Sequence, residues 1–99
     1  MLNKCKEILK NYYGKQLQGL IVYGSTACKR ADPSSDIDLL VLLSKPFNYF
    51  QELRRITDLL YPLQLESERL ISAKPAAVDE FESGEIQLYR NAKRDGVAV

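Results

Sequence analysis

The stretch that decides the fold is Gly24-Ser25-Thr26-Ala27-Cys28-Lys29-Arg30-Ala31-Asp32-Pro33-Ser34-Ser35-Asp36-Ile37-Asp38, because an apolar run stands on each side of it. Leu-Ile-Val-Tyr ends at residue 23, and Leu-Leu-Val-Leu-Leu begins at residue 39. Short apolar runs bounded by Gly, Pro and Ser are typical of buried strands. The pattern predicts a strand over 17–23 and a second strand over 36–43. Between them it predicts a loop that contains a helix of less than two turns.

The remaining segments alternate between helical and extended patterns. Apolar spacing predicts a helix over 3–14, capped by Asn3 and stopped by Gly14, and a helix over 48–61 that Pro62 ends. Alternation over 63–71 predicts a third strand, which Lys74-Pro75 follows as a break. Two further helices are expected over 76–83 and 85–94, the last one ended by Gly96. The expected class is α/β, a sheet with flanking helices.

Composition limits the classes of function. The chain has 99 residues and a formal net charge of +1, so we expect a single domain over 1–99 and no direct binding to nucleic acid. No apolar run approaches the roughly 20 residues of a membrane span, and the N-terminus lacks the apolar region of a signal peptide. The expected location is therefore the cytoplasm, without a membrane partner.

The absence of histidine restricts the possible catalytic groups. Cys5 and Cys28 alone cannot complete the four-ligand set of a zinc site. Without histidine there is also no Ser-His or Cys-His nucleophile pair. Catalysis would depend on carboxylates, Lys or Arg, hydroxyl groups or a hard cation.

The central stretch carries two features that suit a metal-bound nucleotide. Gly24 and Ser25 follow a strand and open a short helix, whose free N–H groups can hold phosphate. Asp36 and Asp38 lie two apart, so they share one face of the second strand. Two ionised carboxylates at neighbouring positions of one face repel each other unless a cation lies between them. Carboxylate oxygens are ligands that favour Mg²⁺ or Mn²⁺.

The spacing Gly24-Ser25, ten residues, Asp36-Ile37-Asp38 resembles the signature of minimal nucleotidyltransferases of the DNA polymerase beta superfamily. The resemblance implies a small mixed β-sheet with flanking α-helices and an ATP substrate. It also implies that Gly24 and Ser25 contact the triphosphate, that Asp36 and Asp38 hold the metal, and that a third carboxylate lies on a neighbouring strand. Our first choice for that carboxylate is Glu68, and Glu66 is the second.

Two positions depart from the pattern of that family, which often reads Gly-Ser-x-Ala-Arg-Gly. Cys28 and Lys29 stand where the family has Arg and Gly. The missing arginine would weaken a substrate contact unless Lys29 or Arg30 compensates for it.

Small stand-alone proteins that resemble this chain are antitoxins of HEPN/MNT toxin–antitoxin pairs. The resemblance implies a hetero-oligomer in which AMP passes from ATP to a tyrosine of the HEPN toxin. We expect the acceptor to come from outside the chain, because 99 residues leave no room for an acceptor-binding domain. Two alternatives stay open: an antitoxin that acts by binding and has a degenerate nucleotide site, and a subunit of a small-molecule nucleotidyltransferase of the aminoglycoside type.

Overall fold

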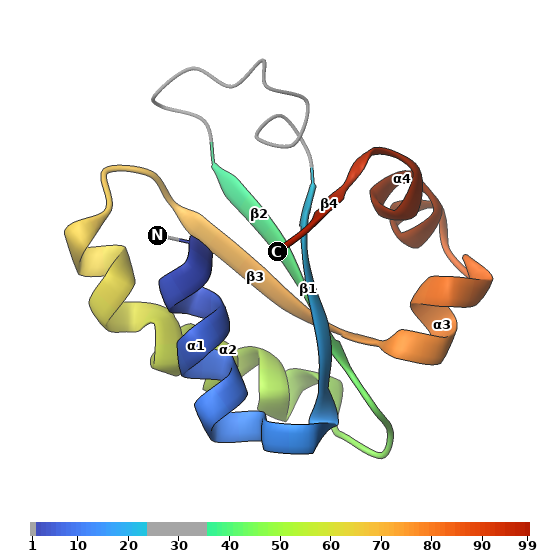
Figure 1. Ribbon diagram of the computed structural model, residues 1–99, viewed down its shortest axis with the longest axis horizontal. Coiled ribbons are helices and arrows are strands. Elements are labelled where there is room, and N and C mark those ends of the chain that lie inside the picture. Colours follow the sequence, from blue (N-terminus) through green and yellow to red (C-terminus); the bar gives the residue numbers. More distant parts are fainter. Residues whose placement is uncertain (1, 24–35) are drawn as a thin grey trace.

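A computed structural model describes residues 2–23 and 36–99, which form a four-stranded mixed sheet with helices on both faces (Figure 1). The strand order is β3-β2-β1-β4. The elements, in chain order, are α1 (Leu2–Tyr13), a short 3-10 helix (Gly14–Gln16), β1 (Leu17–Tyr23), β2 (Ile37–Leu43), α2 (Tyr49–Glu66), β3 (Ile71–Ala77), α3 (Val78–Ser83), α4 (Gln87–Asp95) and β4 (Val97–Ala98). The predicted α/β class is confirmed.

Strand β2 is central and is paired on both sides. It runs antiparallel to β1, with Tyr23 opposite Asp38, and parallel to β3, with Ile37 opposite Ile71. Strand β4 pairs with the other edge of β1. Because β2 is covered on both faces, it reads as a continuous apolar run, which is why the sequence located it well.

The two faces of the sheet pack against different helices (Figure 1). One face carries Leu39, Val41 and Leu43, which are buried with side chains of α1 and α2. The opposite face carries Leu40 and Leu42, which pack with residues of α3 and α4. Alternation along β2 therefore decides which residues each pair of helices covers.

Most of the predicted elements agree with the structure. Helix α1 ends at Tyr13, and Gly14 has a φ of +58°, a conformation that glycine adopts at low cost. The two C-terminal helices lie within two residues of the predicted ranges, and α4 ends at Asp95, directly before Gly96.

The prediction that Pro62 ends the second long helix is wrong, because α2 continues through it to Glu66. Pro62 is exposed, so the helix carbonyl that loses its N–H partner can be hydrated. Leu63 extends the buried stripe of Ile56 and Leu60, and this burial favours another turn of helix.

The predicted third strand over 63–71 is also wrong. Residues 63–66 belong to α2, and the strand is Ile71–Ala77, which contains the Lys74-Pro75 pair that was expected to break it. Leu70 accepts a hydrogen bond from Ile37 N at 2.8 Å, so by alternation the nitrogen of Pro75 faces the open edge of β3. Proline is tolerated on an edge strand in that orientation because no ladder bond is lost there.

None of the helices in the described parts of the chain is long and apolar enough to cross a membrane.

Candidate nucleotide site

The paired aspartates lie at the end of the sheet where β1 stops and β2 begins. Asp36 directly precedes β2 and is exposed, and Asp38 is half-buried as the second residue of the strand. Asp38 has the same parity as Leu40 and Leu42, so it belongs to the face that α3 and α4 cover. The charge of Asp36 acts on the Asp38 carboxyl. Because Asp36 precedes the first residue of β2, the shared strand face of the two carboxylates stays a prediction.

Asp38 is flanked on both neighbouring strands. In the register of the sheet, Tyr23 of β1 lies opposite it on one side and Ser72 of β3 on the other. Arg69, in the turn before β3, approaches the same end of the sheet, with Nη2 3.5 Å from the backbone oxygen of Asp36. Tyr23, Ser72 and Arg69 therefore lie at the same end of the sheet as the two aspartates.

Burial and a neighbouring like charge both act on the Asp38 carboxyl. Burial, and then the negative charge of Asp36, raise the pKa of the Asp38 carboxyl, while the Lys74 ammonium lowers it. Burial also raises the pKa of the Tyr23 phenol, and the charge of Asp38 raises it further. A divalent cation between the aspartates would remove this repulsion, so Asp36 and Asp38 fit the share of ligands that Mg²⁺ takes from a protein.

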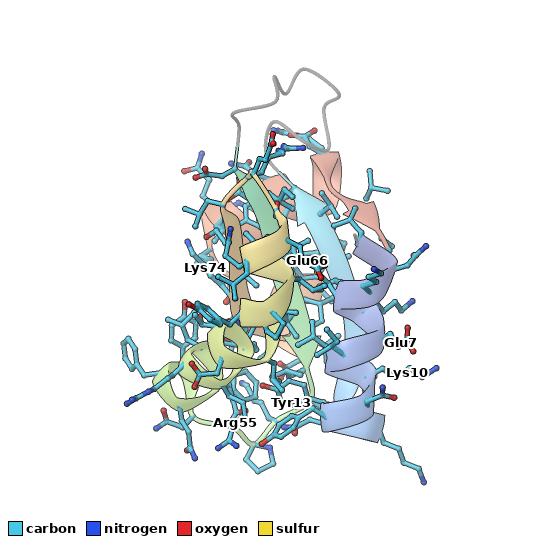
Figure 2. All side chains as sticks on the ribbon, turned by 90° about the vertical axis from the view of Figure 1, so that its left-hand side faces the viewer. Glu7, Lys10, Tyr13, Arg55, Glu66 and Lys74 are labelled. Carbon is cyan, nitrogen blue, oxygen red and sulfur yellow. The ribbon has the colours of Figure 1, made fainter. Side chains whose placement is uncertain are left out.

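The two glutamates predicted as candidates for the third carboxylate do not lie on a strand. Glu66 is the last residue of α2, which packs against the face opposite Asp38 (Figure 2). Glu68 lies in the segment between α2 and β3. Neither residue is on a strand, because the strand begins at Ile71. Among residues 2–23 and 36–99, no three Asp, Glu, Cys or His side chains gather as a metal-binding group. The metal-binding role of Glu68 stays a prediction.

Gly24 and Ser25, which were predicted to contact the triphosphate, lie outside the described residues, as do Cys28 and Lys29. Their roles stay predictions.

Strand β3 brings two residues to the candidate site that were not predicted from the sequence. Ser72 and Lys74 lie on the face of Asp38, since Ser72 is opposite Asp38 and Lys74 is opposite Leu40. A signal was available in the sequence: polar residues are spaced two apart at the start of each strand, as Asp-x-Asp in β2 and Ser-x-Lys in β3. It was not used because Lys74-Pro75 was expected to break the strand.

Comparison with known families identifies the class. Residues 3–99 match the family described as polymerase beta, nucleotidyltransferase, which is nearly the whole chain. The chain therefore belongs to the polymerase beta nucleotidyltransferase family, whose domains carry out nucleotidyl transfer.

The same fold occurs in a solved structure. A protein from Sulfolobus solfataricus, crystallised as a candidate nucleotidyltransferase, superposes with a TM-score of 0.65 at 20% sequence identity. The match covers 99% of this chain and 78% of the other. A search among curated protein sequences gave no significant match. The structural likeness establishes the nucleotidyltransferase fold, with its mixed sheet and flanking helices.

Proposed function

We propose that this chain transfers AMP from ATP to a tyrosine of a cognate HEPN-domain toxin. The supporting observation is the pair Asp36 and Asp38 at the start of β2, where the charge of Asp36 acts on the Asp38 carboxyl, in a chain of the nucleotidyltransferase family. The nature of the acceptor rests on the resemblance to stand-alone antitoxins. The protein would then act in a hetero-oligomer with its acceptor.

The chain's own groups suggest how the substrate would be held. Asp36 and Asp38 would bind Mg²⁺ or Mn²⁺, which when bound neutralises phosphate charge and increases the electrophilicity of the α-phosphorus. In the transfer, the tyrosine oxygen forms a bond to the α-phosphorus and its proton passes to solvent. The bond from the α-phosphorus to the β-phosphate bridging oxygen breaks, and pyrophosphate leaves.

A labelled-nucleotide experiment tests this proposal. The full chain is incubated with ATP labelled at the α-phosphate, Mg²⁺ and the protein encoded beside it, and the products are analysed by intact mass and tryptic mapping. We expect one or more AMP groups on tyrosine of the partner. The Asp36→Ala/Asp38→Ala variant should lose this labelling, whereas Glu7→Ala, which removes an exposed carboxylate from α1, should keep it (Figure 2).

A second candidate function is an antitoxin that inhibits by contact alone. The observation that favours it is the absence of any carboxylate from β3, whose sequence is Ile-Ser-Ala-Lys-Pro-Ala-Ala. A partner that forms a tight complex but gains no AMP would refute the transfer proposal and support this one. An adjacent gene without an Arg-x(4–6)-His motif would instead favour a small-molecule acceptor.

A further inference from the structure

The face of β3 next to the aspartates presents a cation where a further carboxylate would be needed. In the parallel pairing of β2 and β3, Ser72 lies opposite Asp38, and Lys74 lies opposite Leu40. Paired residues of neighbouring strands point to the same side of a sheet. Figure 2 shows Lys74 on the side of β3 away from α1, in agreement with this register.

Lys74 is close enough to Asp38 to affect its charge. The two residues are diagonal neighbours, separated by one strand spacing of about 4.8 Å and by about 6.6 Å along the strand. The four-carbon stem of lysine spans such a separation easily, and the charge of Lys74 favours the ionised form of Asp38. Lys74 is half-buried, so solvent screens this interaction only in part.

A cation at this position opposes a second metal ion. Two-metal phosphoryl transfer places ions about 3.5–4 Å apart, and the second ion needs carboxylates of its own. Within the described residues, β3 supplies none, and its ammonium would repel a divalent cation. A lysine ammonium is, in contrast, a common partner for phosphate oxygens.

We propose that Lys74 replaces a second metal ion: the site binds one divalent cation per nucleotide, and the Lys74 ammonium pairs with the phosphates of a nucleoside triphosphate. This inference rests on the proposed nucleotide site and assigns its metal stoichiometry. It makes Lys74 a binding residue contributed by β3, beside the two aspartates contributed by the start of β2.

Equilibrium dialysis with Mn²⁺ and the non-hydrolysable analogue α,β-methylene-ATP tests the stoichiometry. We expect the wild-type chain to retain one Mn²⁺ per bound nucleotide. Lys74→Asp adds a carboxylate beside Asp38 and should raise the ratio to two. Electron paramagnetic resonance gives an independent readout, since two Mn²⁺ ions at bridging distance broaden each other's signal.

A second variant tests the phosphate contact without metal. Lys74→Met keeps the length of the side chain and removes its charge, so the affinity for α,β-methylene-ATP in EDTA should fall about fivefold or more. Lys10→Met, on the exposed side of α1, is the matched control and should bind like the wild type (Figure 2). If Lys74→Asp fails to fold, the role of Lys74 is still tested by the Mn²⁺-to-nucleotide ratio of the wild type and by the nucleotide affinity of Lys74→Met.

The possible outcomes separate the two proposals. Two Mn²⁺ ions per nucleotide in the wild type, or unchanged affinity in Lys74→Met, would overturn the role of Lys74 and leave the nucleotide site standing. No retention of nucleotide by the wild type, with or without Mn²⁺, would overturn the proposed function and this inference together.

Discussion

The two faces of the sheet are built differently, although the same strands form both. The face under α1 and α2 is closed by a large continuous cluster that includes Cys5, Leu9, Leu39 and Ile56, all fully buried. The face under α3 and α4 buries a much smaller cluster around Leu40 and Leu42. Towards the start of β2, this second face carries Asp38 instead of an apolar side chain. The difference indicates that one face supplies most of the stability and the other carries the site.

The largest expected effect comes from truncating one leucine on each face. Leu39→Ala removes a side chain with 0% exposure from the cluster with α1 and α2, and should lower the free energy of unfolding by about 3–5 kcal/mol. Leu42→Ala, in the smaller cluster, should cost about 2–3 kcal/mol because fewer neighbours surround the cavity. Urea unfolding followed by circular dichroism measures both values. An equal or larger cost at Leu42 would contradict the assignment of stability to the α1/α2 face.

A smaller effect is expected from the hydrogen bond that joins the two helices of the closed face. Tyr13 of α1 donates its hydroxyl to Glu52 Oε1 of α2 at 2.9 Å. Tyr13→Phe should lower the free energy of unfolding at pH 7 by about 1 kcal/mol. Tyr61→Phe, which changes an exposed tyrosine of α2, should alter it by less than about 0.5 kcal/mol.

The same hydrogen bond gives a pH dependence. Burial, and then the bond to Glu52, raise the pKa of the Tyr13 phenol above its usual value of about 10. The unfolded chain therefore loses this proton first, so the stabilisation is complete below about pH 10 and declines as the pH rises further. The free energy of unfolding, measured between pH 8 and 11, should decline less steeply with pH in Tyr13→Phe than in the wild type. An equal slope in the two proteins would show that Tyr13 does not contribute to the pH dependence.

The smallest effect on stability is expected at the candidate site, where substitution of Asp38 should stabilise the fold instead of destabilising it. Because burial and Asp36 raise the pKa of the Asp38 carboxyl, its ionised form is disfavoured in the folded chain, and stability falls as the pH rises through that titration. Asp38→Asn should therefore raise the melting temperature at pH 7, and the gain should vanish below about pH 4. The same variant should lose Mn²⁺ binding. A lower melting temperature would mean that Asp38 stabilises the fold.

The elements that the sequence located well are those with a local signal. Strands β1 and β2 are short apolar runs between turn residues, and α1 has a regular apolar stripe with Gly14 after it. The prediction for the segment 62–77 was wrong because each of its prolines is typical of a break in secondary structure but lies at a position that tolerates proline. Exposure makes Pro62 tolerable inside α2, and the open sheet edge makes Pro75 tolerable inside β3.

The sequence by itself determined the class of the protein and one half of the candidate site. Asp36 and Asp38 are two residues apart at the start of β2, so their proximity needs no long-range information. Only the tertiary structure decided what lies beside them. Strand order and register place Ser72 and Lys74 next to Asp38, and leave Glu66 and Glu68 off the neighbouring strand. Pairing between strands joins residues more than thirty positions apart, and nothing in the local pattern of either strand specifies that alignment.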